Sequence, residues 1–189
     1  MAIEASKIRR WLDEEEYEPT PANQPNAVFS FQAKTRNGLQ FTIWQPKTGP
    51  GKVLITAAIG ISDEERAKLA PRAETLLWTV RYGLLQVGVG FDIQEEAGLP
   101  KVIALVTPVW EDGLSKATFM GELQRVINGM VLVIVSVRHV MTTALILGTA
   151  SSSDEALSKM LAQLRPHAMM LVISSADEYI KDMLTALRA

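Results

Sequence analysis

The sequence predicts an α+β fold. An antiparallel sheet, made of a three-strand meander and a two-strand pair, packs against helices and precedes a C-terminal helical extension. Residues 28–35 and 39–45 alternate apolar and polar side chains, as half-buried strands do. Asn37-Gly38 between them is a strong signal for a tight hairpin turn. Apolar residues then recur at helical spacing over residues 69–84, which predicts an amphipathic helix.

Length and composition indicate one domain. The chain has 189 residues, of which 48% are hydrophobic and 21% are charged. A globular chain of this size and composition buries a substantial core. We expect residues 1–145 to form the α+β domain and residues 146–189 to form a mostly helical extension that packs on the same domain.

Local patterns predict the elements before residue 60. Ile8, Trp11 and Leu12 share one face of a first helix. Residues 18–26 contain three prolines, which cannot continue that helix, and are expected to form a linker. Residues 53–59 are almost uniformly apolar, which predicts a third strand that is covered on both faces.

A helix and a second pair of strands follow. Ser62 and Glu65 have the spacing of a capping box, in which each side chain binds a free backbone N–H at the start of a helix. Residues 87–94 and 101–110 are predicted strands joined by a turn. Pro108 indicates that the second strand ends, or lies at a sheet edge, near that point.

A long helix is predicted from Ser115, with apolar residues at helical spacing up to Met130. Residues 131–137 are rich in β-branched side chains, and propensity alone would also allow a strand there. We favour a helix because no turn signal separates these residues from the preceding pattern.

The C-terminal extension carries two more capping boxes, Ser152 to Glu155 and Ser175 to Glu178. They predict helices over about residues 154–164 and 176–188. The intervening residues 167–173 have the composition of a short strand or of part of a helix, and the pattern leaves both open.

The charge balance argues against nucleic-acid binding. The formal net charge is -2 and the isoelectric point is about 5.8, whereas phosphate recognition calls for a basic surplus. The best basic cluster, Lys7, Arg9 and Arg10, is followed at once by the acidic residues 13–16. A solvated helix surface is the simpler interpretation.

The apolar residues 126–147 are interpreted as a buried core helix and not as a membrane span. Arg138 and His139 fall within this segment, and a charged side chain at the bilayer centre costs about 3 kcal/mol or more. The first 16 residues lack the apolar stretch of a signal peptide, and cysteine is absent. We therefore expect a cytoplasmic protein.

Two glycine-rich sequences resemble nucleotide-binding loops, but neither is complete. The dinucleotide fingerprint that starts at Gly88 requires glycine at the position of Ile93. The phosphate loop that ends at Lys52 would require a glycine in place of Pro46 and a serine or threonine in place of Val53. No cofactor-binding residue is predicted.

No catalytic or metal-binding residue is predicted either. The chain contains no cysteine, and its two histidines, His139 and His167, have no His, Asp or Glu at helical metal-pair spacing. The carboxylate clusters lie at helix surfaces, helix starts and turns, where charged side chains are expected in any case.

Large amphipathic aromatic residues are the candidates for partner contacts, because exposed Trp and Tyr side chains are typical of protein interfaces. They are Trp44, Trp78, Tyr82 and Trp110. Trp44 is the best single candidate, since it lies in the polar register of its strand. The alternative is that Trp44 packs under the C-terminal helices.

The predicted order of helix, meander, helix, strand pair and helix resembles the fold of the YbjN-like proteins and the type III secretion chaperones. The resemblance covers about residues 5–140 and rests on topology. It is carried by Ile8, Trp11 and Leu12, by the Asn37-Gly38 turn, by the strands around Phe91 and Ile103, and by the helix from Ser115.

The resemblance implies a homodimer that binds protein segments or acts as an adaptor, with no catalytic residues and no cofactor. Two other functions are kept as alternatives. One is a small enzyme whose site is assembled around His139 or His167. The other is a structural subunit of a larger complex.

Overall fold

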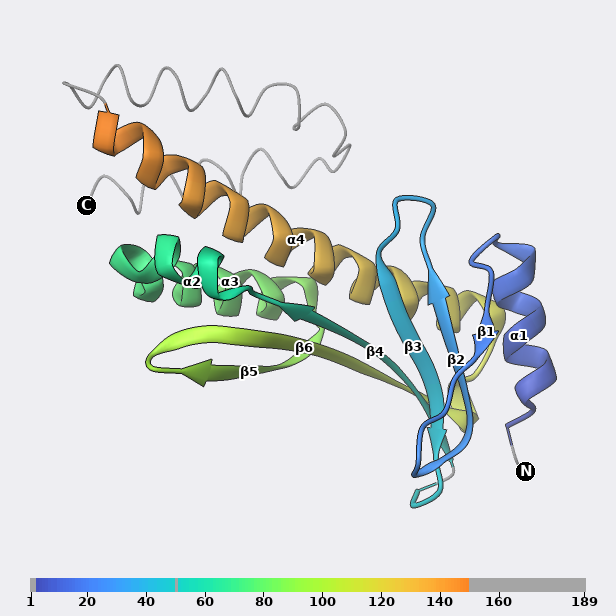
Figure 1. Cartoon of the computed structure of the whole chain (residues 1–189). Coiled ribbons are helices and arrows are strands. Elements are labelled where there is room, and N and C mark those ends of the chain that lie inside the picture. Colours follow the sequence, from blue (N-terminus) through green and yellow to red (C-terminus); the bar gives the residue numbers. More distant parts are fainter. Residues whose placement is uncertain (1–2, 50, 150–189) are drawn as a thin grey trace.

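The computed structural model describes residues 3–49 and 51–149, with side chains up to residue 142. The predicted α+β class is confirmed: one six-stranded antiparallel sheet, ordered β1-β2-β3-β4-β6-β5, packs against helices (Figure 1). The elements are α1 (Ala5–Glu14), β1 (Thr20–Pro21), β2 (Ala27–Lys34), β3 (Gln40–Pro46), β4 (Lys52–Gly60), α2 (Asp63–Leu69), α3 (Ala73–Val87), β5 (Gly90–Glu96), β6 (Leu99–Trp110) and α4 (Lys116–Thr149).

Strands β2, β3 and β4 form the predicted meander. Gly38 has a positive φ of 81°, and its N–H donates to the carbonyl of Thr35 in the turn between β2 and β3. The predicted linker was only partly right, because Thr20–Pro21 within it forms the edge strand β1 against β2. A two-residue strand leaves little pattern in the sequence.

Burial alternates along the two longest strands, β4 and β6. In β4, Val53, Ile55 and Ala57 are buried, whereas Leu54 is half-buried and Ala58 is exposed. The prediction that this strand is covered on both faces was therefore wrong. The apolar side chains on the two faces of β4 differ in burial because helices α2, α3 and α4 lie on one side of the sheet (Figure 1).

Strands β5 and β6 form the predicted pair, although β5 begins later than expected, at Gly90, because α3 continues to Val87. Gly88 ends α3 in the left-handed conformation, with a φ of 73°. Pro108 lies within β6 beyond Val106, the last β6 residue paired with β5. The strand therefore does not end at Pro108, but it lies at an edge on that side, as predicted.

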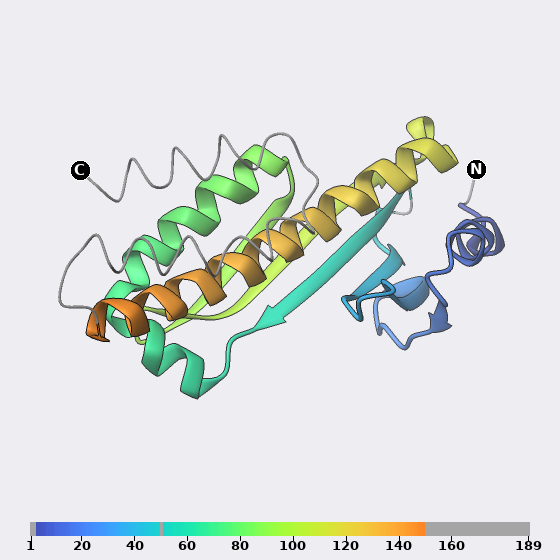
Figure 2. The same ribbon diagram turned by 90° about the horizontal axis from the view of Figure 1, so that it is seen from above.

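Helix α4 settles the ambiguity at residues 131–137 in favour of a helix. Its buried face packs against the sheet and against α3, which lies beside it in Figure 2. The start of α4 also meets α1, where the rings of Trp11 and Phe119 lie 5.7 Å apart. The helix passes residue 145 and continues to Thr149. The capping boxes and helices predicted beyond it lie outside the described residues.

Candidate protein-contact surfaces

Helix α3 presents an exposed apolar surface on its outer side. Trp78, Tyr82 and Leu85 recur at the i, i+4, i+7 spacing of one helix face, and their exposed fractions are 55%, 42% and 67%. The rings of Trp78 and Tyr82 stack with centroids 5.3 Å apart and planes 2° apart. We call these three residues the α3 stripe. The opposite face of α3 is buried through Leu76, Val80 and Leu84.

The α3 stripe is flanked by a polar contact. Arg81 donates from Nη2 to Glu95 Oε1 on β5 at 2.8 Å, and both side chains remain partly exposed. This ion pair connects α3 to the edge strand of the sheet. An apolar centre with a charged margin is the usual layout of a protein-contact surface.

A second apolar surface lies on the side of the sheet turned away from the buried core. A row of paired residues crosses this side: Trp44 of β3 pairs with Leu54 of β4, and Leu54 pairs with Pro108 of β6. Side chains of directly paired residues lie on the same face of a sheet. Trp110 lies on the same face, with 55% of its surface exposed, and Lys52 Nζ lies 5.1 Å from its ring centroid. We call Trp44, Leu54, Pro108 and Trp110 the open sheet face.

The four predicted contact residues therefore lie on two different surfaces. Trp78 and Tyr82 belong to the α3 stripe, whereas Trp44 and Trp110 belong to the open sheet face. Trp44 is half-buried, and its indole Nε1 is buried with no hydrogen-bond partner within the described chain. Leu85, the most exposed of these side chains, was missed, although its spacing of seven from Trp78 was a usable signal.

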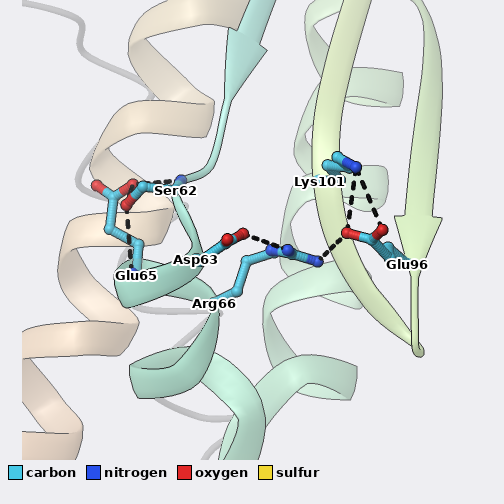
Figure 3. A network of polar contacts seen from close by, with 6 residues as sticks. All are labelled: Ser62, Asp63, Glu65, Arg66, Glu96 and Lys101. Carbon is cyan, nitrogen blue, oxygen red and sulfur yellow. Dashed lines mark hydrogen bonds and ion pairs between the residues drawn. The ribbon is translucent and has the colours of Figure 1, made fainter.

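A network of charged side chains fixes α2 against the β5–β6 hairpin (Figure 3). Arg66 binds Asp63 on its own helix and reaches Glu96 of β5 at 2.7 Å. Lys101 of β6 contacts the same Glu96 carboxylate at 3.2 Å. Hydrogen bonds from Lys101 and then Arg66 hold the pKa of Glu96 below its ordinary value. The Glu96 carboxylate therefore stays ionised at neutral pH, as its ion pairs with Arg66 and Lys101 require, and the network has a structural role.

The capping box beside this network is confirmed. Glu65 N–H donates to Ser62 Oγ at 3.3 Å, and Ser62 N–H donates to Glu65 Oε2 at 2.8 Å. These contacts with Ser62 lower the pKa of Glu65. The N-terminus of α2 therefore keeps its first free N–H groups satisfied, and Arg66 is held in position to reach the hairpin.

His139 lies on α4 and is partly buried. Burial, followed by the positive charge of Arg72, lowers the pKa of its imidazole below the ordinary value. His167 lies outside the described residues. Within residues 3–49 and 51–149, no group of three or more His, Cys, Asp or Glu side chains is arranged to hold a metal ion.

Helix α4 is unusually long and apolar. Among the described helices, its portion Lys116–Thr142 is long and apolar enough to cross a bilayer, with 44% of the most apolar window buried in the protein. Its buried residues include Leu123, Val126 and Val133, which belong to the core. Core helices of packed domains pass the same length and composition test, so this result is weak support for a membrane span.

The sequence model of the protein family described as "Uncharacterized conserved protein (DUF2299)" matches residues 4–137. Among solved structures, the chain is similar to an uncharacterized protein from Methanothermobacter thermautotrophicus. The two share 23% identity over 70% of this chain and 95% of that chain, with a TM-score of 0.66. No curated protein matches the chain.

YbjN from E. coli is also similar, at 12% identity over 73% of this chain and 94% of that chain, with a TM-score of 0.48. The archaeal structure and this chain share one fold over most of the residues that the family model matches. Likeness at these identities concerns the fold, and function has to be argued from the surfaces.

Proposed function

The chain therefore belongs to the DUF2299 family of uncharacterized conserved proteins, and on this premise we propose that it is a non-catalytic adaptor, a homodimer that binds protein segments in the cytoplasm. The observation that carries the proposal is the pair of separate apolar surfaces, one on α3 and one on the sheet. An adaptor needs two such surfaces, one for each partner. Nucleic acid and membrane are not among the proposed partners.

The α3 stripe suits an amphipathic helix supplied by a partner protein. Stacked Trp and Tyr rings bring a large contact area with little loss of side-chain freedom, which is why such residues dominate binding energy at interfaces. The helix has 15 residues, so it is about 22 Å long. That length accommodates three or four turns of a partner helix with anchors at i, i+4 and i+7.

The open sheet face suits a second copy of this chain. Two sheets can stack face to face at about 10 Å, with side chains from both faces filling the space between them. The row from Trp44 through Leu54 to Pro108 crosses three adjacent strands, β3, β4 and β6, and provides apolar side chains for such packing. A two-fold axis through this row would place it against its own copy.

Light scattering on a size-exclusion column tests the homodimer. We expect a mass of twice 20.8 kDa for the full chain. Pro108→Glu should give the monomer mass at micromolar concentration, because dimerisation would bury an unpaired charge. Gln94→Glu is the matched control: it adds the same charge on the same face of the sheet, away from the apolar row. A monomeric full chain, or a dimeric Pro108→Glu protein, would contradict the proposal.

Selection of a phage-displayed library of 16-residue peptides on the full chain tests segment binding. We expect it to enrich amphipathic sequences with apolar residues at i, i+4 and i+7. Their affinity should fall at least tenfold for Leu85→Glu, about 1.4 kcal/mol or more. The control Val28→Glu alters an exposed apolar residue on β2 and should leave binding unchanged. Peptides that bind Leu85→Glu as tightly as the wild type would exclude the α3 stripe as the binding surface.

A further inference from the structure

We propose that the C-terminal segment, residues 150–189, folds back over the α3 stripe and covers it in the unbound protein. The segment would then act as a built-in competitor of protein segments, a consequence that rests on the function proposed above. The covering itself does not depend on that function. Three features of the described residues and of the sequence support it.

The first feature is the direction in which α4 runs relative to α3. Gly129 of α4 lies against Leu84, near the end of α3. Ten residues further on lies His139, whose pKa is lowered by burial and then by the positive charge of Arg72. Arg72 directly precedes the start of α3, so this part of α4 lies near that end of α3. The two helices are thus antiparallel and lie side by side in Figure 2. The described part of α4 ends at Thr149, beyond the start of α3, so a segment that returned from there would run along α3.

The second feature is the pattern of the segment. Its two predicted helices each carry apolar residues at i, i+4 and i+7, the same spacing as the α3 stripe. They are Leu157, Leu161 and Leu164 in one helix and Ile180, Leu184 and Leu187 in the other. A helix over residues 176–188 would be about 20 Å long, close to the length of α3. Each predicted helix can therefore match the stripe over several turns.

The third feature is proximity along the chain. About 40 residues follow α4, which is enough to reach α3 by a turn and a helix of either predicted length. A tethered segment meets its site at an effective concentration in the millimolar range. A second copy of the chain at micromolar concentration competes poorly with such a segment. The segment is therefore the favoured occupant of the α3 stripe.

The absence of cysteine allows a direct test in the full-length protein. Leu85→Cys places the single thiol in the α3 stripe, and Val28→Cys places it on β2, where the native side chain is 59% exposed. The reaction rate of each thiol with a chromogenic disulfide reagent is then measured over a range of protein concentrations. We expect the thiol at position 85 to react at least tenfold more slowly than the thiol at position 28, at every concentration.

Polar substitutions in the segment identify what covers the stripe. Leu161→Asp or Leu184→Asp, each added to Leu85→Cys, should raise the labelling rate toward that of Val28→Cys. Thr185→Asp adds the same charge on the polar side of the second predicted helix and should leave the rate low. This contrast separates loss of an apolar contact from a general effect of charge on the segment.

Two results would overturn the proposal. If the thiol at position 85 reacts as fast as the thiol at position 28, nothing covers the stripe. If the labelling rate of the thiol at position 85 falls as protein concentration rises, and neither Leu→Asp substitution changes that rate, the occupant is a second copy. Neither result bears on peptide binding, which is measured separately. Conversely, if peptide selection fails even on the Leu161→Asp and Leu184→Asp proteins, in which the stripe is uncovered, the proposed function is removed and the covering stands.

Discussion

Replacing Gly129 by valine is expected to destabilise the domain by about 1–3 kcal/mol, as overpacking of a tight core does. A Cβ at this position would lie 3.1 Å from Val89, 3.2 Å from Leu105 and 3.3 Å from Leu84. These three side chains are buried and come from different parts of the fold, so none can move aside freely. The midpoint of urea unfolding, followed by circular dichroism, measures the effect.

Gly121, eight residues earlier on the same helix, is the control for Gly129. It is exposed, and a Cβ there meets nothing within 4 Å. Gly121→Ala should therefore stabilise the protein by up to about 1 kcal/mol through helix propensity alone. Gly129→Ala should fall below it, because the same gain is offset by crowding. Equal midpoints for the two alanine variants would show that α4 does not cross α3 and β6 this closely.

Local signals in the sequence predicted the turns and helix starts well. The Asn37-Gly38 turn and the Ser62–Glu65 capping box depend on side chains and φ values within a few residues. The short stretch of sequence that forms each of them is therefore enough to predict it. The long helix over residues 131–137 was also predicted from local continuity. Its β-branched residues have low helix propensity, but packing against the sheet outweighs that preference.

Coverage of a surface could not be predicted from local pattern. The third strand is apolar on both sides, yet Leu54 and Ala58 lie on the face turned away from the core. Which face of a strand is covered depends on helices that are distant in sequence. The same holds for Leu85: its spacing of seven from Trp78 places both residues on one face of α3, but the spacing does not say whether that face is covered. The exposure of Leu85 follows from how α3 is rotated by its contacts with β6 and α4, not from its neighbours in the chain.

Phe119→Ala is expected to have the largest effect of the substitutions proposed, about 3–5 kcal/mol of lost stability. Phe119 is fully buried at the start of α4, where its ring meets Trp11 of α1 at 5.7 Å. Removing the ring leaves a cavity between α1, α4 and the sheet, and the neighbouring side chains can close it only in part. Urea unfolding followed by circular dichroism measures the loss.

Lys116→Ala tests how much the ion pairs between α1 and α4 contribute to stability, apart from the packing of the Trp11 and Phe119 rings. Lys116 Nζ lies 2.8 Å from carboxylate oxygens of both Glu14 and Glu15 at the end of α1, and these side chains are partly exposed. Solvent-exposed ion pairs contribute little to stability, so this variant should unfold close to the wild type. If Lys116→Ala cost as much as Phe119→Ala, charge and not ring packing would hold α1 against the domain.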